Sequence, residues 1–352
     1  MPSTHRSIRT LVATATVSTL LLAMPGAVSA TVPAYDFATP VFGLATAPDG
    51  SLLVADGGAG IVELRKGAGS LVAELPGVSD VAPIGRGVMW AVTAAFGLPG
   101  EKTLYRVARG HATAVADLGA FEATANPDGA QIDSNPFDVA SLSGGSALVA
   151  DAAANALLIV NRRGKVDWVA TLPGEVVSTA NAQSLIGCPD VPDEFADLAF
   201  LCDVPMMPAE AVATSVAIGA DGAYYVGELK GFPAPTGESR VWRIEPGTRH
   251  ADCGTSSACS VVADGFTSII DLSFGPDGTL YVTELDESSW AAVEITGGGS
   301  GGTVNACDWS SWSCSEVATG LPLPAAATVA RGTLYAAIWS LVPGMAEVIP
   351  LS

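Results

Sequence analysis

One pattern occurs six times along this 352-residue chain, and it limits the fold more than any other feature. Each copy has a short apolar run, a turn that contains glycine, and a second apolar run that an acid often follows. Clear copies begin at Gly43 (GLATAPDGSLLVAD), Phe137, Thr214 and Ile270, and weaker copies begin at Ser79 and Ala325. Two such runs joined by a Pro-Asp-Gly turn indicate a β-hairpin, because glycine adopts the positive φ that the turn needs.

Further apolar runs follow each hairpin, such as ALLIV and KVDWVATL after the third copy. They predict four strands per repeat, and six four-stranded repeats predict an all-β, six-bladed β-propeller. The last repeat has room for only three strands before Ser352. We expect residues 35–39 to add the missing outer strand and close the ring, which removes an exposed sheet edge.

The first 30 residues have the pattern of a secretory signal peptide. Arg6 and Arg9 precede an apolar stretch, and small residues stand at positions 28–30, where cleavage occurs. The propeller is then expected over residues 31–352, with its largest insertion at about 174–208. No other segment approaches the roughly 20 apolar residues of a membrane span. The sequence therefore predicts an exported protein, either extracellular or in the cell envelope, without a membrane span.

Acidic residues dominate the charge, with 36 Asp and Glu against 16 Lys and Arg and a formal net charge of −20. Such a surface repels phosphate backbones and anionic lipids, which excludes nucleic acid as an expected partner. Cations are the small partners that this charge favours. The alternative is that the charge only keeps an exported protein soluble.

Six cysteines follow residue 187 as three close pairs, which is typical of disulfides in an exported chain. Short loops favour the sequential pairing, and the spacings do not match zinc sites. The expected disulfides are Cys188–Cys202, Cys253–Cys259 and Cys307–Cys314.

Three long phrases resemble one family of exported propellers. They are FDVASLSGGSALVADAAANALLIV, SVAIGADGAYYVGELKGFPAPTGESRVWRIEPGT, and FTSIIDLSFGPDGTLYVTELDESSWAAVEI with GGTVNAC. The chain looks like the NHL-type propellers and, more specifically, is similar to the ScyD/ScyE family, first named from scytonemin-pigment gene clusters. The resemblance covers nearly all of the chain after the signal peptide. It implies the propeller fold and export, and it implies no particular activity.

Position in the repeat also predicts position in space, because the innermost strand of each blade starts at one face of the channel. Seven residues before each turn glycine stand Gly43, Asp80, Asp138, Ser215, Asp271 and Ala325. Like charges converging on a channel repel unless they are protonated, hydrogen-bonded or bridged by a cation. We therefore predict a Ca²⁺ site at Asp80, Asp138 and Asp271. The alternative is a water-filled channel whose acids are satisfied locally.

A second set of acids ends the second strand of four blades on the same face. Six residues after each turn glycine stand Asp56, Thr93, Asp151, Glu228, Glu284 and Ile338. Such acids commonly accept N–H groups of the next turn. A binding role is the other hypothesis, with Ser215, Glu228 and Glu284 as ligand-binding residues and Phe232 and Trp290 as an apolar lip. The run DEFADLAFL in the insertion predicts a short helix over the channel.

The chemistry of the chain favours binding over catalysis. His111 and His250 fall on outer strands, away from the channel face, which argues against a nucleophile–histidine system and a His-ligated zinc. We expect a monomeric extracellular binding or scaffold propeller, whose acidic channel face binds a small ligand, a cation or a protein. The alternative is a calcium-dependent hydrolase or lyase of the lactonase-like type, with Asp138 and Asp271 as ligands and Asp80 or Glu228 as base.

Overall fold

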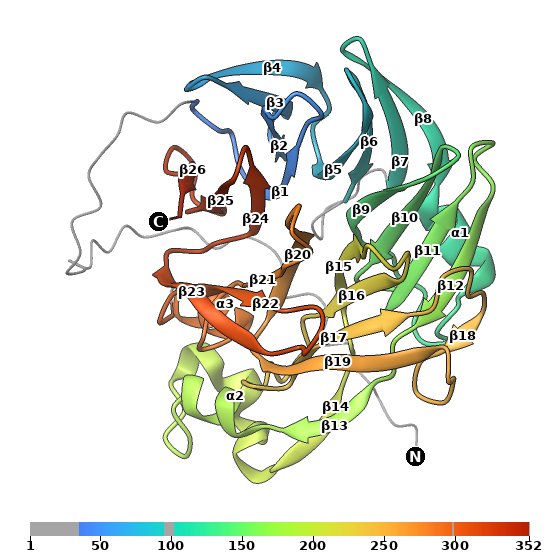
Figure 1. Cartoon of the computed structure of the whole chain (residues 1–352). Helices are drawn as coiled ribbons and strands as arrows, with labels where there is room; N and C mark the ends of the chain where they lie inside the picture. The colour runs from blue at the N-terminus through green and yellow to red at the C-terminus, as the bar shows by residue number, and fades with distance from the viewer. Residues whose placement is uncertain (1–34, 95–101, 298, 352) are drawn as a thin grey trace.

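The computed structural model describes residues 35–94, 102–297 and 299–351, and the predicted signal peptide lies outside them. Six antiparallel sheets surround a central axis as the blades of a β-propeller (Figure 1), which confirms the predicted fold. We number the blades 1 to 6 in chain order. Figure 1 shows them following one another around the axis from blue to red.

Each blade pairs its strands in chain order from the axis outward. Blade 1 contains β1 (Val41–Thr46), β2 (Leu52–Asp56), β3 (Gly60–Arg65) and β4 (Ala68–Glu74). Blade 2 contains β5 (Val78–Gly85), β6 (Val88–Thr93), β7 (Thr103–Ala108) and β8 (His111–Asp117), and α1 (Leu118–Ala125) follows it. Blade 3 contains β9 (Pro136–Leu142), β10 (Ser146–Asp151), β11 (Ala156–Val160) and β12 (Val166–Thr171).

The second half of the ring repeats this order with longer connections. Blade 4 contains β15 (Ala213–Ile218), β16 (Tyr224–Glu228), β17 (Ser239–Ile244) and β19 (Cys259–Phe266). Blade 5 contains β20 (Ile269–Phe274), β21 (Leu280–Glu284), β22 (Gly302–Cys307) and β23 (Cys314–Leu321), with α3 (Trp290–Thr296) between β21 and β22. Blade 6 contains β24 (Ala326–Ala330), β25 (Thr333–Ile338) and β26 (Glu347–Pro350).

The hydrophobic core is divided among the spaces between blades. Side chains alternate across a strand, so Leu52 and Val54 of β2 pack toward blade 6, while Leu53 and Ala55 pack toward blade 2. A comparable apolar cluster fills each of the other four spaces. The nearly continuous apolar runs of the repeats are explained by this burial on both faces.

Ring closure differs from the prediction. Blade 6 has three strands, and within the described residues no strand from the N-terminal segment pairs with β26. The N–H of Ala38 donates instead to Asp56 Oδ2 at 2.8 Å, and Phe37 packs with Val41 and Ala346 between blades 1 and 6. The predicted outer strand over residues 35–39 is therefore wrong, because this segment bonds to blade 1 and packs between blades 1 and 6, where the N–H of Val41 also donates to the Ser340 carbonyl at 2.8 Å.

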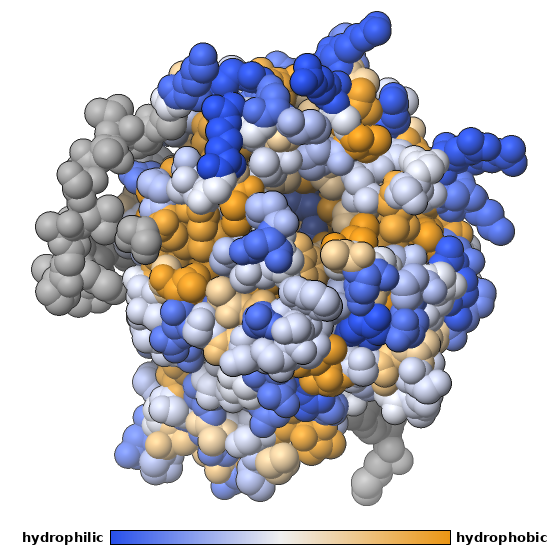
Figure 2. Space-filling model, in the orientation of Figure 1, coloured by the Kyte–Doolittle hydropathy of each residue, from blue (hydrophilic) through white to orange (hydrophobic). Residues whose placement is uncertain are grey.

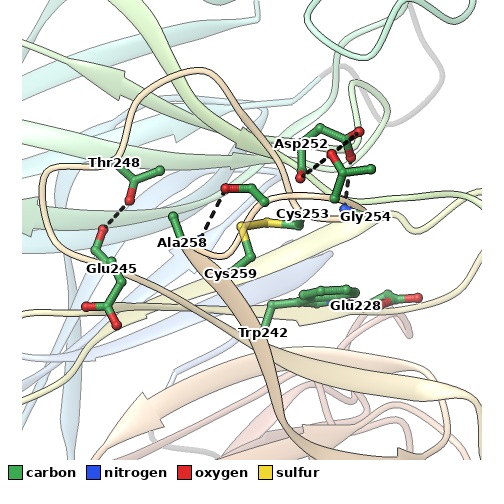
Figure 3. The surroundings of a disulfide bond; sticks show 11 residues. Glu228, Trp242, Glu245, Thr248, Asp252, Cys253, Gly254, Ala258 and Cys259 are labelled. Atoms are coloured by element: carbon green, nitrogen blue, oxygen red, sulfur yellow. Dashed lines mark hydrogen bonds between the residues drawn. A yellow bond between two sulfur atoms is a disulfide. The ribbon is translucent and has the colours of Figure 1, made fainter.

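All three predicted disulfides are present: Cys188–Cys202, Cys253–Cys259 and Cys307–Cys314. Cys307 and Cys314 face each other across the hairpin that joins β22 to β23. In blade 4, the Cys253–Cys259 disulfide closes a longer connection, and Trp242 lies beside it (Figure 3). That connection carries β18 (Ala251–Asp252), which adds to blade 3 as a parallel fifth strand beside β12, a pairing that the sequence did not indicate.

The insertion between blades 3 and 4 forms a separate small unit. It contains the hairpin β13 (Glu175–Ser178) and β14 (Met206–Ala209), the helix α2 (Ala180–Leu185), and a 3₁₀ helix over Asp193–Asp203. Its apolar residues pack against Phe232 of blade 4 and Ile295 of α3. The helix predicted over DEFADLAFL forms as this 3₁₀ helix. In Figure 1, β13, β14 and α2 lie at the periphery, below blades 4 and 5, so the insertion stands beside the blades rather than over the channel. None of the helices in the described part is long and apolar enough to cross a membrane.

Candidate functional site: the channel face

The three predicted channel aspartates occupy equivalent positions on inner strands. Asp80, Asp138 and Asp271 pair with the residue that precedes the last residue of the neighbouring second strand. In blade 6 the equivalent residue is Ala326, not Ala325, because the two-residue turn over Arg331 and Gly332 has no bulge beside it, whereas the equally short turn of blade 2 has a bulge that restores the count. Counting seven residues back from the turn glycine therefore finds the equivalent position for the three acids and misses it by one residue in blade 6.

Each channel aspartate joins its own blade to the next. Asp80 Oδ2 accepts the N–H of Val139 at 3.0 Å, and Asp138 Oδ2 accepts the N–H of Val216 at 2.6 Å. Asp271 Oδ2 accepts the N–H of Ala327 at 2.9 Å. The acceptor is a carboxylate in every case and the donor is the inner strand of the following blade, so these bonds connect blades at the channel wall.

The channel carboxyls also interact with one another. Burial and the neighbouring charge of Asp138 raise the pKa of Asp80 and of Asp271 well above the ordinary value of 3.8. Asp80 and Asp138 are hydrogen-bonded through their side chains, an arrangement that favours a proton on Asp80. Gly43 makes room for this pair, because a Cβ at Gly43 would lie 2.2 Å from Asp80 Oδ1. Hydrogen bonding between Asp80 and Asp138, together with the raised pKa values, reduces the charge repulsion that the sequence indicated, and a cation at these residues stays a prediction.

The acids that end the second strands are buried and engaged. Asp56 Oδ1 accepts the N–H of Gly58 at 3.1 Å, and Asp151 accepts the Ser134 hydroxyl at 2.7 Å and the N–H of Asn135 at 2.6 Å. Glu284 accepts the N–H of Thr267 and the Asn305 amide. Burial raises the pKa of Glu284 to about 7 and that of Asp151 to about 6. Asp56, Asp151 and Glu284 thus each accept a backbone N–H from the segment that leads into the inner strand of the same blade, and only Asp56 and Asp151 also bond to the turn that follows them, as predicted.

Glu228 belongs to a buried ion network that attaches the insertion to blade 4. Trp242 Nε1 donates to Glu228 Oε2 at 2.6 Å (Figure 3), and Lys230 forms an ion pair with Glu228. Lys230 Nζ also lies 2.9 Å from Glu175 Oε2 on β13, and Arg240 lies 2.7 Å from Glu175 Oε1. Both Glu228 and Lys230 have fully buried side chains. Burial raises the pKa of Glu228, and Lys230 opposes that shift.

The other three predicted ligand-binding residues are placed as follows. Ser215 is buried, and its hydroxyl has no hydrogen-bond partner in the described part of the chain. Phe232 is half-buried against the insertion. Trp290 is half-buried too, and its indole N–H donates to the Lys230 carbonyl at 3.0 Å. The structure brings Glu228, Phe232 and Trp290 to adjoining loops of blades 4 and 5, while a ligand-binding role for them stays a prediction.

An apolar cluster stands at the channel face where the sequence predicted an acidic mouth. Phe42, Phe137 and Ile270 each precede a channel position on the inner strands of blades 1, 3 and 5, and all three belong to one cluster with Trp290. The rings of Phe42 and Phe137 are 4.9 Å apart. Since these blades are not neighbours, their side chains can meet only near the axis. The aspartates therefore lie beside an apolar mouth, a feature that the apolar residue directly before the channel position in blades 1, 3 and 5 could have revealed.

Little else on this face has the form of a conventional site. Among the described residues, no three His, Cys, Asp or Glu side chains lie close enough together to hold a metal ion. The two depressions of about 520 and 510 Å³ lie elsewhere, beside β8 and beside the β13–β14 hairpin. Figure 2 shows a hollow with a hydrophilic floor near the centre of the face in view.

Both histidines beyond the predicted signal peptide lie on the outside of the propeller, as predicted. His111 begins β8 and is exposed. His250 is exposed, stacks on Trp168 and lies 2.7 Å from Asp167, so it fastens the connection of blade 4 to blade 3. Neither reaches the channel aspartates.

No family model matches the chain, and no curated protein matches it. Solved structures show the same fold at low sequence identity. A Bacteroides thetaiotaomicron protein of unknown function is 12% identical with a TM-score of 0.53, over 89% of this chain and 70% of that one. A gluconolactonase from Xanthomonas campestris is 13% identical with a TM-score of 0.55, over 91% and 89%. The aldose sugar dehydrogenase of Streptomyces coelicolor, bound to PQQ, is 11% identical with a TM-score of 0.53, over 90% and 95%.

Proposed function

We propose that this protein is an exported binding or scaffold propeller of the ScyD/ScyE type, which binds a protein partner through its insertion. The observation that carries the proposal is a contrast between the channel wall and the insertion. The channel aspartates are hydrogen-bonded to the backbone of the next blade, whereas the insertion presents apolar side chains to solvent. Val176 is 63% exposed, Met206 is 50% exposed and Phe200 is 42% exposed.

The charge of the insertion indicates what kind of partner it fits. Residues 174–208 contain six acids and no Lys or Arg. Most of these acids are exposed: Asp190, Asp193, Glu194, Asp197 and Asp203. Exposed apolar side chains on a segment whose charges are all negative are complementary to a protein surface that combines apolar and basic residues. We therefore assign this surface to a basic protein partner.

Rigid attachment of the insertion supports the same role. The Cys188–Cys202 disulfide closes the insertion, and the Glu175 ion pairs hold β13 to Lys230 and Arg240 of blade 4. Asn181 donates to the Ala234 carbonyl at 2.7 Å and to the Ser289 hydroxyl at 2.9 Å. A surface held in one geometry loses little conformational entropy when it binds. Export agrees with the three disulfides.

Site-specific photocrosslinking tests the proposal. A photoreactive residue is placed at Val176 or at Phe200, and a matched control is placed at Leu71, which is 40% exposed on β4. Irradiation in cultures of the producing cells should give one adduct from the two insertion positions and none from position 71. The partner identified in that adduct should be basic. The purified partner should bind this protein more weakly at high salt. It should also bind the Glu194→Lys, Asp197→Lys variant at least tenfold more weakly than the unmodified protein. Adducts that are equal at position 71, or absent, contradict the proposal.

The alternative is a calcium-dependent hydrolase or lyase, and an activity assay separates it from binding. Each of Asp80, Asp138 and Asp271 accepts a backbone N–H through one carboxylate oxygen, and Asp80 and Asp138 bond to each other, so these acids have partners within the fold; a calcium site at these residues stays a prediction. We expect no turnover of a panel of lactones and esters, with or without Ca²⁺. Calcium-dependent turnover that Asp271→Ala abolishes establishes the enzyme instead.

A further inference from the structure

The third strand of blade 6 has a free edge. In each of the other blades an outer strand covers the third strand, whereas β26 pairs only with β25 among the described strands. Every other third strand, β3, β7, β11, β17 and β22, contains at least three buried residues. β26 contains none, because three of its residues are half-buried and Pro350 is exposed. Blade 6 is therefore uncovered where the other five blades are covered.

The hydrogen bonds of β26 show which of its backbone groups face outward. The N–H of Leu351 donates to the Leu334 carbonyl at 2.8 Å, and the register of β26 with β25 continues from this pair. Bonded and unbonded pairs alternate in an antiparallel sheet, so Ile349 bonds to β25, and the N–H and C=O of Val348 point away from it. Pro350 also points away, where its missing N–H costs no bond. The free edge thus offers the Val348 N–H and the carbonyls of Val348 and Pro350.

Apolar side chains lie on both faces of this edge. Val348 packs with Tyr335 toward blade 1, and Ile349 packs with Trp339 toward blade 5. All four side chains are half-buried. A further strand beside β26 extends both faces of the blade, so its own apolar side chains cover these four as well as pairing with the free backbone groups.

The charge around the edge indicates what kind of strand it fits. Glu347 is the only charged residue in the three strands of blade 6. The outer strands of the two neighbouring blades, β4 and β23, carry the exposed Glu74 and Glu316 and no Lys or Arg. This negative charge attracts a basic segment. It repels a second copy of the chain, which has 36 acidic and 16 basic residues.

We propose that β26 is the acceptor edge for an extended, basic segment of a protein partner, which adds to blade 6 as its fourth strand. The added strand runs antiparallel to β26, as the outer strands of the other blades run beside their third strands. Backbone hydrogen bonds to Val348 supply affinity, and a Lys or Arg near Glu347 supplies selectivity. In Figure 1, β26 and the β13–β14 hairpin lie on different sides of the ring, so this surface is independent of the partner proposed for the insertion.

Titration of a labelled peptide tests the edge. The probe is fluorescein-KVTVIVK-amide, and its binding is followed by fluorescence polarisation. We expect saturable binding by the unmodified protein, and binding about tenfold weaker or less for the same peptide with N-methylated backbone amides, because these cannot donate to the edge. The peptide EVTVIVE should bind more weakly still, since its charge is reversed. This comparison changes the peptide alone, so it does not depend on how any variant folds.

Three variants locate the binding on the protein. Val348→Pro removes the outward N–H and no hydrogen bond of the described fold, and it should abolish peptide binding. Glu347→Lys should weaken binding about tenfold, as expected for a lost charge-assisted contact. Asp264→Lys changes an exposed acid on β19 of blade 4 and should leave binding unchanged.

Three results overturn the proposal. One is the absence of binding up to millimolar peptide. Another is equal binding of the N-methylated peptide, or equal binding by Val348→Pro, which moves the contact away from the edge. The third comes from sedimentation of the unmodified protein alone: a dimer that Val348→Pro dissociates assigns the edge to a second copy of the chain. Loss of the crosslinks from the insertion, with peptide binding retained, contradicts only the function proposed for the insertion.

Discussion

The channel wall and the segment around α1 both contain buried carboxylates, but the hydrogen-bond donors of these carboxylates come from different kinds of segment. Asp80, Asp138 and Asp271 each face the inner strand of the next blade, which presents a backbone N–H at the same place every time. Glu122 stands on a helix that belongs to no blade, and the backbone N–H that acts on it as a donor comes from Asp133, in the loop after the helix. A repeat architecture therefore satisfies its own acids by symmetry. A buried acid that falls outside the repeat must find its partner elsewhere.

Glu228 is a third case, because the positive charge of one buried side chain, Lys230, offsets its negative charge. Removing Lys230 should have the largest effect on the free energy of unfolding. Lys230→Met leaves Glu228 buried beside Trp242 without its cation. We expect a loss of about 3–5 kcal/mol in the free energy of unfolding, as for other broken buried pairs. Urea unfolding followed by tryptophan fluorescence measures this loss.

The double variant Glu228→Gln, Lys230→Met is the control. It removes both charges and keeps an oxygen for the Trp242 N–H, so it should regain most of the stability lost in Lys230→Met. If Lys230→Met unfolds within about 1 kcal/mol of the unmodified protein, then the stability of the fold does not depend on the ion pair between Glu228 and Lys230.

Truncating a channel aspartate should have an intermediate effect. Asp138→Ala leaves the Val216 N–H and the Asp80 carboxyl without their acceptor, and we expect a loss of about 1–3 kcal/mol. Asp138→Asn should cost less, because its amide oxygen accepts the Val216 N–H and its amide nitrogen donates to Asp80. Equal losses for both variants would show that the inter-blade bond is not what Asp138 contributes.

The dependence of stability on pH should show the smallest effect. Burial and the charge of Asp138 raise the pKa of Asp271 above its ordinary value of 3.8. Between those two pKa values the folded state binds more protons than the unfolded state, so stability falls as pH rises through this window. Asp271→Asn should make that fall shallower, as measured by denaturant unfolding from pH 4.5 to 8 in the presence of a chelator.

Asp277, on the turn of the same blade, is the matched control. Hydrogen bonds from Thr279 lower its pKa, so its contribution is present above pH 3.8 and is lost as pH falls below that value. Asp277→Asn should therefore leave the slope between pH 5 and 7 unchanged. A slope that both variants change equally would remove Asp271 as its source.

Sequence reasoning located the channel residues because register in a repeat is periodic. Counting back from the turn glycines placed Asp80, Asp138 and Asp271 at equivalent positions, and it failed only in blade 6, where a two-residue turn without a bulge shifts Ala326 into that place. The count could not show that Phe42, Phe137 and Ile270 meet near the axis, because residues on non-adjacent blades become neighbours only when the ring closes. It also missed Glu122, since that residue lies outside the repeat.

The sequence by itself determined the six hairpin repeats, the apolar runs buried on both faces, and the three short-range disulfides, because each depends on residues close together in the chain. Tertiary structure decided the rest. It closed the ring through Phe37 without a fourth strand in blade 6, and it placed β18 on a neighbouring blade. It also determined which acids have donors. Those outcomes depend on distant segments meeting, and the state of a buried carboxylate is set by the groups around it rather than by its own place in the chain.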